Sequence, residues 1–173
     1  MKRVILDTNI YGNIAIDPKR LEIVKKIIGG KELIVYGNKI IRNELRDVPK
    51  KIKVNNRNLR IDLLDLFDVI VKKHLYTIKS NVDKIAGQYY LSYKEFGGFK
   101  PKEKIISDFK IIAFATIHEL DIVVSNDEKT MLTENAIRAY KLVNSILNKR
   151  TPNFIDYNKF KMLLGGRFSN EII

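Results

Sequence analysis

Two short apolar runs in this chain each finish close to an aspartate, and this feature restricts the fold more than any other. Residues 4–7 read VILD and residues 122–127 read IVVSND, so Asp7 and Asp127 follow the two runs. Runs rich in β-branched residues and without polar alternation are typical of strands covered on both faces, as in a parallel sheet. Ligands of open α/β sheets bind beyond the carboxyl ends of the strands. The two aspartates therefore predict an acidic site at that edge of a parallel sheet.

Strand and helix patterns alternate on both sides of a central segment. Strand patterns at 2–6 and 32–36 are each followed by a helical pattern, and the alternation resumes from 104 onward. This order favours a parallel sheet with right-handed crossovers. Two helical periodicities fall between 50 and 103. We expect one domain over residues 1–173, an α/β three-layer α/β/α sandwich with a mainly parallel sheet of about 4–5 strands and a helical hairpin inserted at about 50–103.

Composition excludes several classes of protein. The chain has no cysteine, so disulfides, cysteine-based zinc sites and cysteine nucleophiles are excluded. Only His74 and His118 can offer nitrogen, so a metal would be held mainly by oxygen. The first apolar run stops at Asp7, too early for a signal-peptide core, and no run approaches the roughly 18 residues of a membrane span. We expect a soluble, cytoplasmic protein without membrane contact.

The chain is strongly basic, with a net charge of +12 and a pI of about 9.7. Such a charge favours an anionic partner, most commonly nucleic acid, although a lysine-rich solubilising surface is the simpler alternative. Two basic clusters flank the predicted acidic edge in sequence and are candidates for RNA contact. They consist of Lys50, Lys51, Lys53, Arg57 and Arg60, and of Lys100, Lys102 and Lys104.

Two further acids belong with the aspartates that follow the strands. Asp108 lies near the start of the helix predicted over 104–119, and Glu44 lies on a short helix after the second strand. Helix starts and strand ends share an edge in βαβ units, so Asp108 should face the same edge as Asp7 and Asp127. Crowded carboxylates raise one another's pKa, and a divalent cation removes that repulsion. Oxygen ligation favours Mg²⁺ or Mn²⁺, and two such ions about 4 Å apart can promote phosphodiester cleavage.

Each acid taken alone has a simpler explanation. Asp7 and Asp127 could cap the helices that follow them, because aspartate is favoured there. Asp108 could respond to the helix dipole, and Glu44 could be a solvated surface charge. None of these explanations predicts two acid-terminated strands, an acid on the intervening helix and a basic protein together. The joint pattern favours a cation site.

Three segments resemble the PIN domain family, metal-dependent nucleases related to the toxin ribonucleases of toxin–antitoxin pairs. VILDTNI at 4–10 resembles the family's strand-Asp-Thr-Asn/Ser start, and IIRNEL at 40–45 resembles its helix with a single Glu. SDFKIIAFATIHELDIVVSND at 107–127 resembles its Asp-led helix with an Ala-rich middle and a strand ending in Thr/Ser-x-Asp. The resemblance covers residues 1–49 and 104–164 well and the middle poorly.

The resemblance implies roles for individual residues. Asp7, Glu44, Asp108 and Asp127 would be catalytic and would hold Mg²⁺ or Mn²⁺, while Asn9 and Ser125 would orient those carboxylates. The implied reaction is endonucleolytic hydrolysis of a phosphodiester in single-stranded RNA by a metal-bound hydroxide, leaving a 5′-phosphate and a 3′-hydroxyl. Asp47 is an alternative to Glu44 on the same helix. Glu119 and Asp121 are excluded, because they precede their strand and lie at its amino end.

Several functions stay open at this stage. The first is a PIN-type ribonuclease, either a toxin or an RNA-processing enzyme, with the inserted helices as a candidate surface for an antitoxin or a homodimer. The second is a catalytically inactive PIN-fold nucleic-acid-binding module. The third, an aspartyl phosphatase, needs a second acid where this chain has Asn9. Tyr89, Tyr90 and Tyr93 could stack on unpaired bases, but core packing is the preferred interpretation of Tyr89 and Tyr93.

Overall fold

A five-stranded parallel sheet forms the centre of the protein, in a computed structural model that describes residues 1–77 and 80–165. The spatial order of the strands is β5-β2-β1-β6-β7, and β1 pairs in parallel with both β2 and β6. The expected α/β fold class with a mainly parallel sheet is confirmed. The strands are β1 (Lys2–Leu6), β2 (Leu33–Asn38), β5 (Leu75–Tyr76), β6 (Ile122–Val124) and β7 (Asn153–Ile155).

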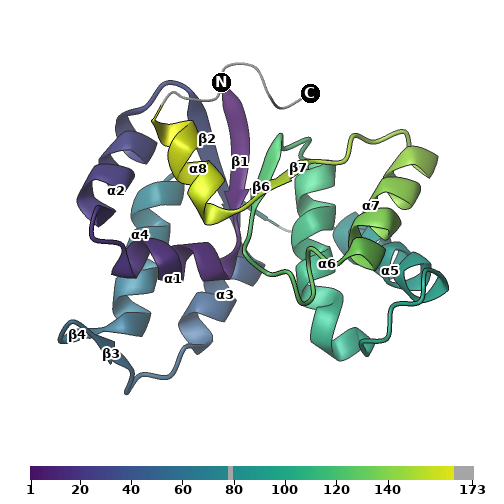
Figure 1. The fold of residues 1–173 in the computed structure, drawn as a ribbon, viewed down its shortest axis with the longest axis horizontal. Helices are drawn as coiled ribbons and strands as arrows, with labels where there is room; N and C mark the ends of the chain where they lie inside the picture. The colour runs from purple at the N-terminus through teal and green to yellow at the C-terminus, as the bar shows by residue number, and fades with distance from the viewer. Residues whose placement is uncertain (78–79, 166–173) are drawn as a thin grey trace.

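Helices cover both faces of the sheet and complete a three-layer α/β/α arrangement (Figure 1). The helix α4 packs against α1, α2 and α3 on one side, whereas α5 packs against α6 and α7 on the other. Within the described residues, no helix is both long enough and apolar enough to cross a membrane. The helices are α1 (Thr8–Ile16), α2 (Arg20–Gly29), α3 (Lys39–Asp47), α4 (Leu59–Val71), α5 (Ser80–Glu95), α6 (Lys102–Ile117), α7 (Glu134–Ile146) and α8 (Tyr157–Leu164).

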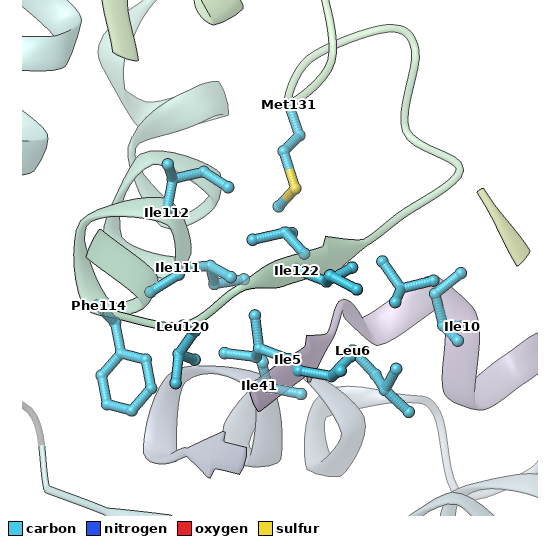
Figure 2. Close-up of a cluster of buried hydrophobic side chains, with 14 of the residues drawn as sticks. Ile5, Leu6, Ile10, Ile41, Ile111, Ile112, Phe114, Leu120, Ile122 and Met131 are labelled. Carbon is cyan, nitrogen blue, oxygen red and sulfur yellow. The ribbon is translucent and has the colours of Figure 1, made fainter. Parts of the chain in front are cut away.

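The hydrophobic core lies on both sides of the central strands β1 and β6. The side chains of Ile5 and Ile122 are buried between α6 on one side and α3 on the other (Figure 2). Burial on both faces explains why these strands lack polar alternation. Met131, from the loop after β6, reaches into the same core and is fully buried. This contact fixes the loop that carries Asp127.

The two helices expected at about 50–103 are α4 and α5, with a short strand between them that was not expected. The helices α4 and α5 lie in opposite layers, and the short strand β5 joins the sheet beside β2 between them. The sequence signal for β5 is only two residues long and follows Lys72 and Lys73, so periodicity could not reveal it. A second feature was also missed, a small antiparallel hairpin of β3 (Lys53–Val54) and β4 (Arg57–Asn58).

Candidate active site

Asp7 occupies the carboxyl end of β1, where it caps the helix α1. Its Oδ1 accepts a hydrogen bond from the Thr8 backbone N–H at 2.7 Å. Its Oδ2 accepts from the Ser125 hydroxyl at 2.7 Å and from the Asn9 amide. Burial raises the pKa of Asp7 to about 6; hydrogen bonds from Ser125 and Thr8 oppose this rise, and the charges of Glu44 and Asp127 add to it. Capping and a site role are therefore both compatible with this carboxylate.

Asp127 lies in the loop that follows β6, three residues beyond Val124. The backbone N–H groups of Lys129 and Thr130 each donate to its Oδ1 at 2.9 Å, and the Thr130 hydroxyl donates to its Oδ2. The backbone N–H of Asp127 in turn donates to the Ser125 hydroxyl oxygen at 3.0 Å. Ser125 therefore connects the Asp127 loop to the carboxylate of Asp7.

Glu44 points from α3 toward the same edge of the sheet. Its two carboxylate oxygens each accept one hydroxyl hydrogen bond, from Thr8 and from Ser107. Asp47, the alternative on this helix, has a side chain that is 76% exposed and lies 4.0 Å from Arg46. The structure therefore brings Glu44, and not Asp47, into contact with residues next to Asp7 and Asp108.

Asp108 lies in the second turn of α6 and completes the group of four acids. Burial raises its pKa to about 7; a hydrogen bond with the Thr130 side chain opposes the rise, and the charges of Asp7, Asp127 and Glu44 add to it. All four carboxylates thus interact electrostatically. We call Asp7, Glu44, Asp108 and Asp127 the acidic quartet.

The acidic quartet is not neutralised by any basic side chain among the described residues. In the part of the chain that the structure describes, none of the four acids takes part in a salt bridge. Asp121, excluded from the site by its position, instead binds the Arg150 guanidinium at 2.7 Å at the other end of β6. The quartet's hydrogen-bond donors among residues 1–77 and 80–165 are neutral hydroxyl and amide groups, in a protein whose net charge is +12.

The quartet offers oxygen donors suited to Mg²⁺ or Mn²⁺, and the raised pKa values of Asp7 and Asp108 fit carboxylates that a cation would stabilise. Across residues 1–77 and 80–165, however, no three acidic or histidine side chains are already arranged to hold a metal ion. Glu44 and Asp127 direct their oxygens at hydroxyl groups of Thr8, Ser107 and Thr130 instead. Cation binding would require these hydroxyls to share or release the carboxylates.

Two hydroxyl residues in this network were missed from the sequence. Ser107 donates to Glu44 across 63 positions of the chain, and Thr130 contacts Asp127 while also lowering the pKa of Asp108. The available signals were only that Ser107 precedes Asp108 and that Thr130 lies three residues after Asp127. Asn9 and Ser125, which were expected to orient the carboxylates, both contact Asp7.

The other candidate residues divide into surface and core groups. Tyr89 and Tyr93 are buried, and the Tyr89 hydroxyl donates to Asn144 at 2.6 Å, so their interpretation as core residues is confirmed. Tyr90 is half-buried. Six of the basic candidates are exposed, and Arg60 and Lys100 are half-buried. The exposed ones are Lys50, Lys51, Lys53, Arg57, Lys102 and Lys104.

Comparison with known proteins concerns the fold. No protein-family model matches the chain, and no curated protein matches its sequence. A chain of VapBC2 from Rickettsia felis, crystallised with a DNA fragment from its promoter, aligns with a TM-score of 0.57 and 13% identity, over 89% of this chain and 98% of that one. A chain of FitAB bound to an IR36 DNA fragment aligns with a TM-score of 0.53 and 15% identity, over 89% and 94%. The chain has a PIN-like fold. This confirms the fold implied by the three resembling segments.

Proposed function

We propose that this protein is a Mg²⁺- or Mn²⁺-dependent endoribonuclease that hydrolyses phosphodiester bonds in single-stranded RNA. The observation that carries the proposal is the acidic quartet, which forms no salt bridge with any of the basic side chains that the structure describes. Buried carboxylates that repel one another favour the binding of positive charge, and here that charge would come from solution. The PIN-like fold supports the assignment to nuclease chemistry at a coarse level.

Each residue of the site has a role in this proposal. Asp7, Glu44, Asp108 and Asp127 would hold the cation, which when bound supplies water activation and stabilisation of the leaving oxygen. Ser125 and Asn9 orient Asp7 through hydrogen bonds to its Oδ2. The amides of Lys129 and Thr130 orient Asp127, and the hydroxyls of Thr8 and Ser107 orient Glu44. Such supporting contacts commonly change metal affinity by roughly 10–100-fold.

A partner protein is part of the proposal. Both fold neighbours come from named complexes bound to DNA, VapBC2 and FitAB. By the resemblance to PIN-type toxins, the partner of this chain would be an antitoxin, and a toxin role is favoured over RNA processing. Copurification of the chain with the product of an adjacent small open reading frame, and inhibition of cleavage by that product, is the expected result.

A second candidate is an inactive PIN-fold module that binds nucleic acid without cutting it. One observation favours it: the oxygens of Glu44 and Asp127 are already taken up by hydroxyl donors, and no ready-made metal arrangement exists among the described residues. Binding of single-stranded RNA without cleavage in any divalent cation would support this candidate over the enzyme.

The test is cleavage of an end-labelled single-stranded RNA in Mn²⁺, in Mg²⁺ and in EDTA. We expect cleavage only with a divalent cation, and a loss of roughly 100-fold or more for Asp7→Asn and for Glu44→Gln. Asp47→Asn is the matched control for Glu44→Gln, because it removes an exposed carboxylate from the same helix. Cleavage that survives both in EDTA and in Asp7→Asn would come from another activity and would refute the assignment.

A further inference from the structure

The β3–β4 hairpin is a well-defined structural element. Its strands pair Lys53 with Asn58 and Val54 with Arg57, which leaves a two-residue turn at Asn55 and Asn56. Both asparagines have positive φ, 50° and 61°. A tight hairpin turn of this type requires positive φ at both central positions, and asparagine tolerates that conformation better than most residues. The hairpin therefore has a fixed shape despite its short strands.

The base of the hairpin is fastened to the helix α4. The Asn58 side chain accepts a hydrogen bond from the Ile61 N–H at 3.1 Å, capping α4, and donates to the Lys50 carbonyl at 2.6 Å. The Leu59 N–H donates to the Ile52 carbonyl at 3.0 Å. An isolated two-stranded hairpin is only marginally stable, so these contacts are what hold its orientation.

The hairpin segment is positively charged and has no neutralising partner. Residues 48–61 contain five lysines and arginines and no acidic residue. Within the described residues, none of these five side chains forms a salt bridge. By contrast, nearby Arg20 and Arg42 bind Asp62 and Asp68 at 2.6 and 2.9 Å. The positive charge of the hairpin is thus available to a partner.

The hairpin is connected in sequence to the helix that carries Glu44 and lies in space beside the junction of α1 with α2. A short connection joins the hairpin to α3, the helix that carries Glu44. Figure 1 shows the hairpin at the lower left of the molecule, below α4 and the end of α1 that is farther from β1. An open cavity of about 450 Å³ lies between the hairpin and the junction of α1 with α2, and Arg57 lines it.

We propose that the hairpin segment, residues 48–61, is an arm that binds the phosphate backbone of the single-stranded RNA that the acidic quartet would cleave, through Lys51, Lys53 and Arg57. This inference rests on the proposed function, since it assigns the arm to the same substrate. The hairpin holds these positively charged side chains in fixed positions. They therefore determine the path of the bound RNA strand, in addition to raising the local concentration of RNA.

The test measures binding without cleavage. Fluorescence anisotropy of a labelled 20-nucleotide single-stranded RNA is followed in EDTA, from 50 mM to 1 M salt, for the wild type and for K51A/K53A/R57A. Loss of three phosphate contacts should lower the salt slope of the affinity by about 2 and weaken binding roughly 100-fold at 0.1 M salt. The matched control K25A/K141A/K149A removes the same charge from exposed lysines elsewhere and should keep the wild-type slope.

Each outcome decides the assignment of the arm. A lower slope in K51A/K53A/R57A alone supports it, and equal slopes in the two triple variants overturn it. A wild-type preference for a 20-base-pair DNA duplex or for an acidic peptide, lost in K51A/K53A/R57A, also overturns it in favour of that partner. The binding assay contains no divalent cation, so its result does not depend on cleavage. If the protein binds RNA through the arm in this assay but does not cleave RNA in Mn²⁺ or Mg²⁺, only the proposed enzyme is refuted. Matching circular dichroism spectra verify that both triple variants fold.

Discussion

The substitution Asp108→Asn should stabilise the protein in the absence of metal. The folded environment raises the pKa of Asp108 from 3.8 to about 7, mainly through burial. Above pH 7 the carboxylate is ionised in both the folded and the unfolded chain. The pKa difference between the two states then lowers the free energy of unfolding by its full amount. At about 1.4 kcal/mol per pH unit, the cost is about 4 kcal/mol at most. Asparagine keeps the shape of the side chain and removes its charge.

The gain in stability should depend on pH in a defined direction. Below pH 3.8 the carboxyl group is protonated in both states, so the raised pKa costs nothing. The cost grows as the pH rises from 3.8 toward 7 and is complete at pH 8. We therefore expect the free energy of unfolding of Asp108→Asn to exceed that of the wild type by about 2–4 kcal/mol at pH 8, which corresponds to a melting-temperature increase of roughly 5–10 °C. At pH 4 the two free energies should differ little.

Urea and thermal unfolding in EDTA at pH 4, 6 and 8 measure this difference. Millimolar Mn²⁺ should raise the melting temperature of the wild type and have a smaller effect on the variant, because one ligand is gone. Asp47→Asn is the control, since its carboxylate is exposed and lies outside the quartet. If Asp108→Asn is destabilising by the same amount at pH 4 and pH 8, the pKa of Asp108 is not raised in the folded protein and the reasoning is wrong.

Three further substitutions test the frame around the site. Met131→Ala should lower the free energy of unfolding by about 2–4 kcal/mol in urea titrations, because a fully buried side chain leaves a cavity under the Asp127 loop. Gly37→Ala should lower it by about 1–3 kcal/mol in the same assay, since the added Cβ would meet the Phe67 ring at 2.7 Å. Asn56→Gly should raise it by up to about 1 kcal/mol and slow amide exchange in the hairpin, because glycine adopts a φ of 61° without strain.

The sequence predicted those parts of the fold in which a clear hydrophobic pattern combines with the known topology of parallel α/β sheets. The β-branched run before Asp7 forms a strand that is buried on both faces, and the parallel order puts helix starts and strand ends at one edge. That rule was sufficient to group Asp108 with Asp7 before any coordinates were known. The strand β5 was not predicted, because a strand of two residues shows no periodicity in the sequence. The β3–β4 turn was not predicted, because its Asn55-Asn56 pair lies inside a basic segment and the two strands that it joins have only two residues each.

The hydroxyl contacts could not be predicted for a different reason. Whether Ser107 reaches Glu44 depends on how α6 is rotated against α3, which no local pattern records. Thr130 contacts its partners because Met131 anchors the loop in the core, and that anchoring is a tertiary effect. Sequence reasoning thus found the acids, which follow from topology, and missed their neutral donors, which follow from packing.

The use of neutral donors around the acidic quartet is itself informative about function. A lysine placed among four carboxylates would relieve their repulsion and stabilise the folded chain permanently. The protein has 32 lysines and arginines, yet the described residues place none in a salt bridge with the quartet. Hydroxyl and amide groups orient the carboxylates without cancelling their charge, so the metal-free protein keeps an electrostatic cost that only an external cation removes. A site that sacrifices stability in this way is expected where function requires the charge, and a purely structural cluster has no reason to retain it.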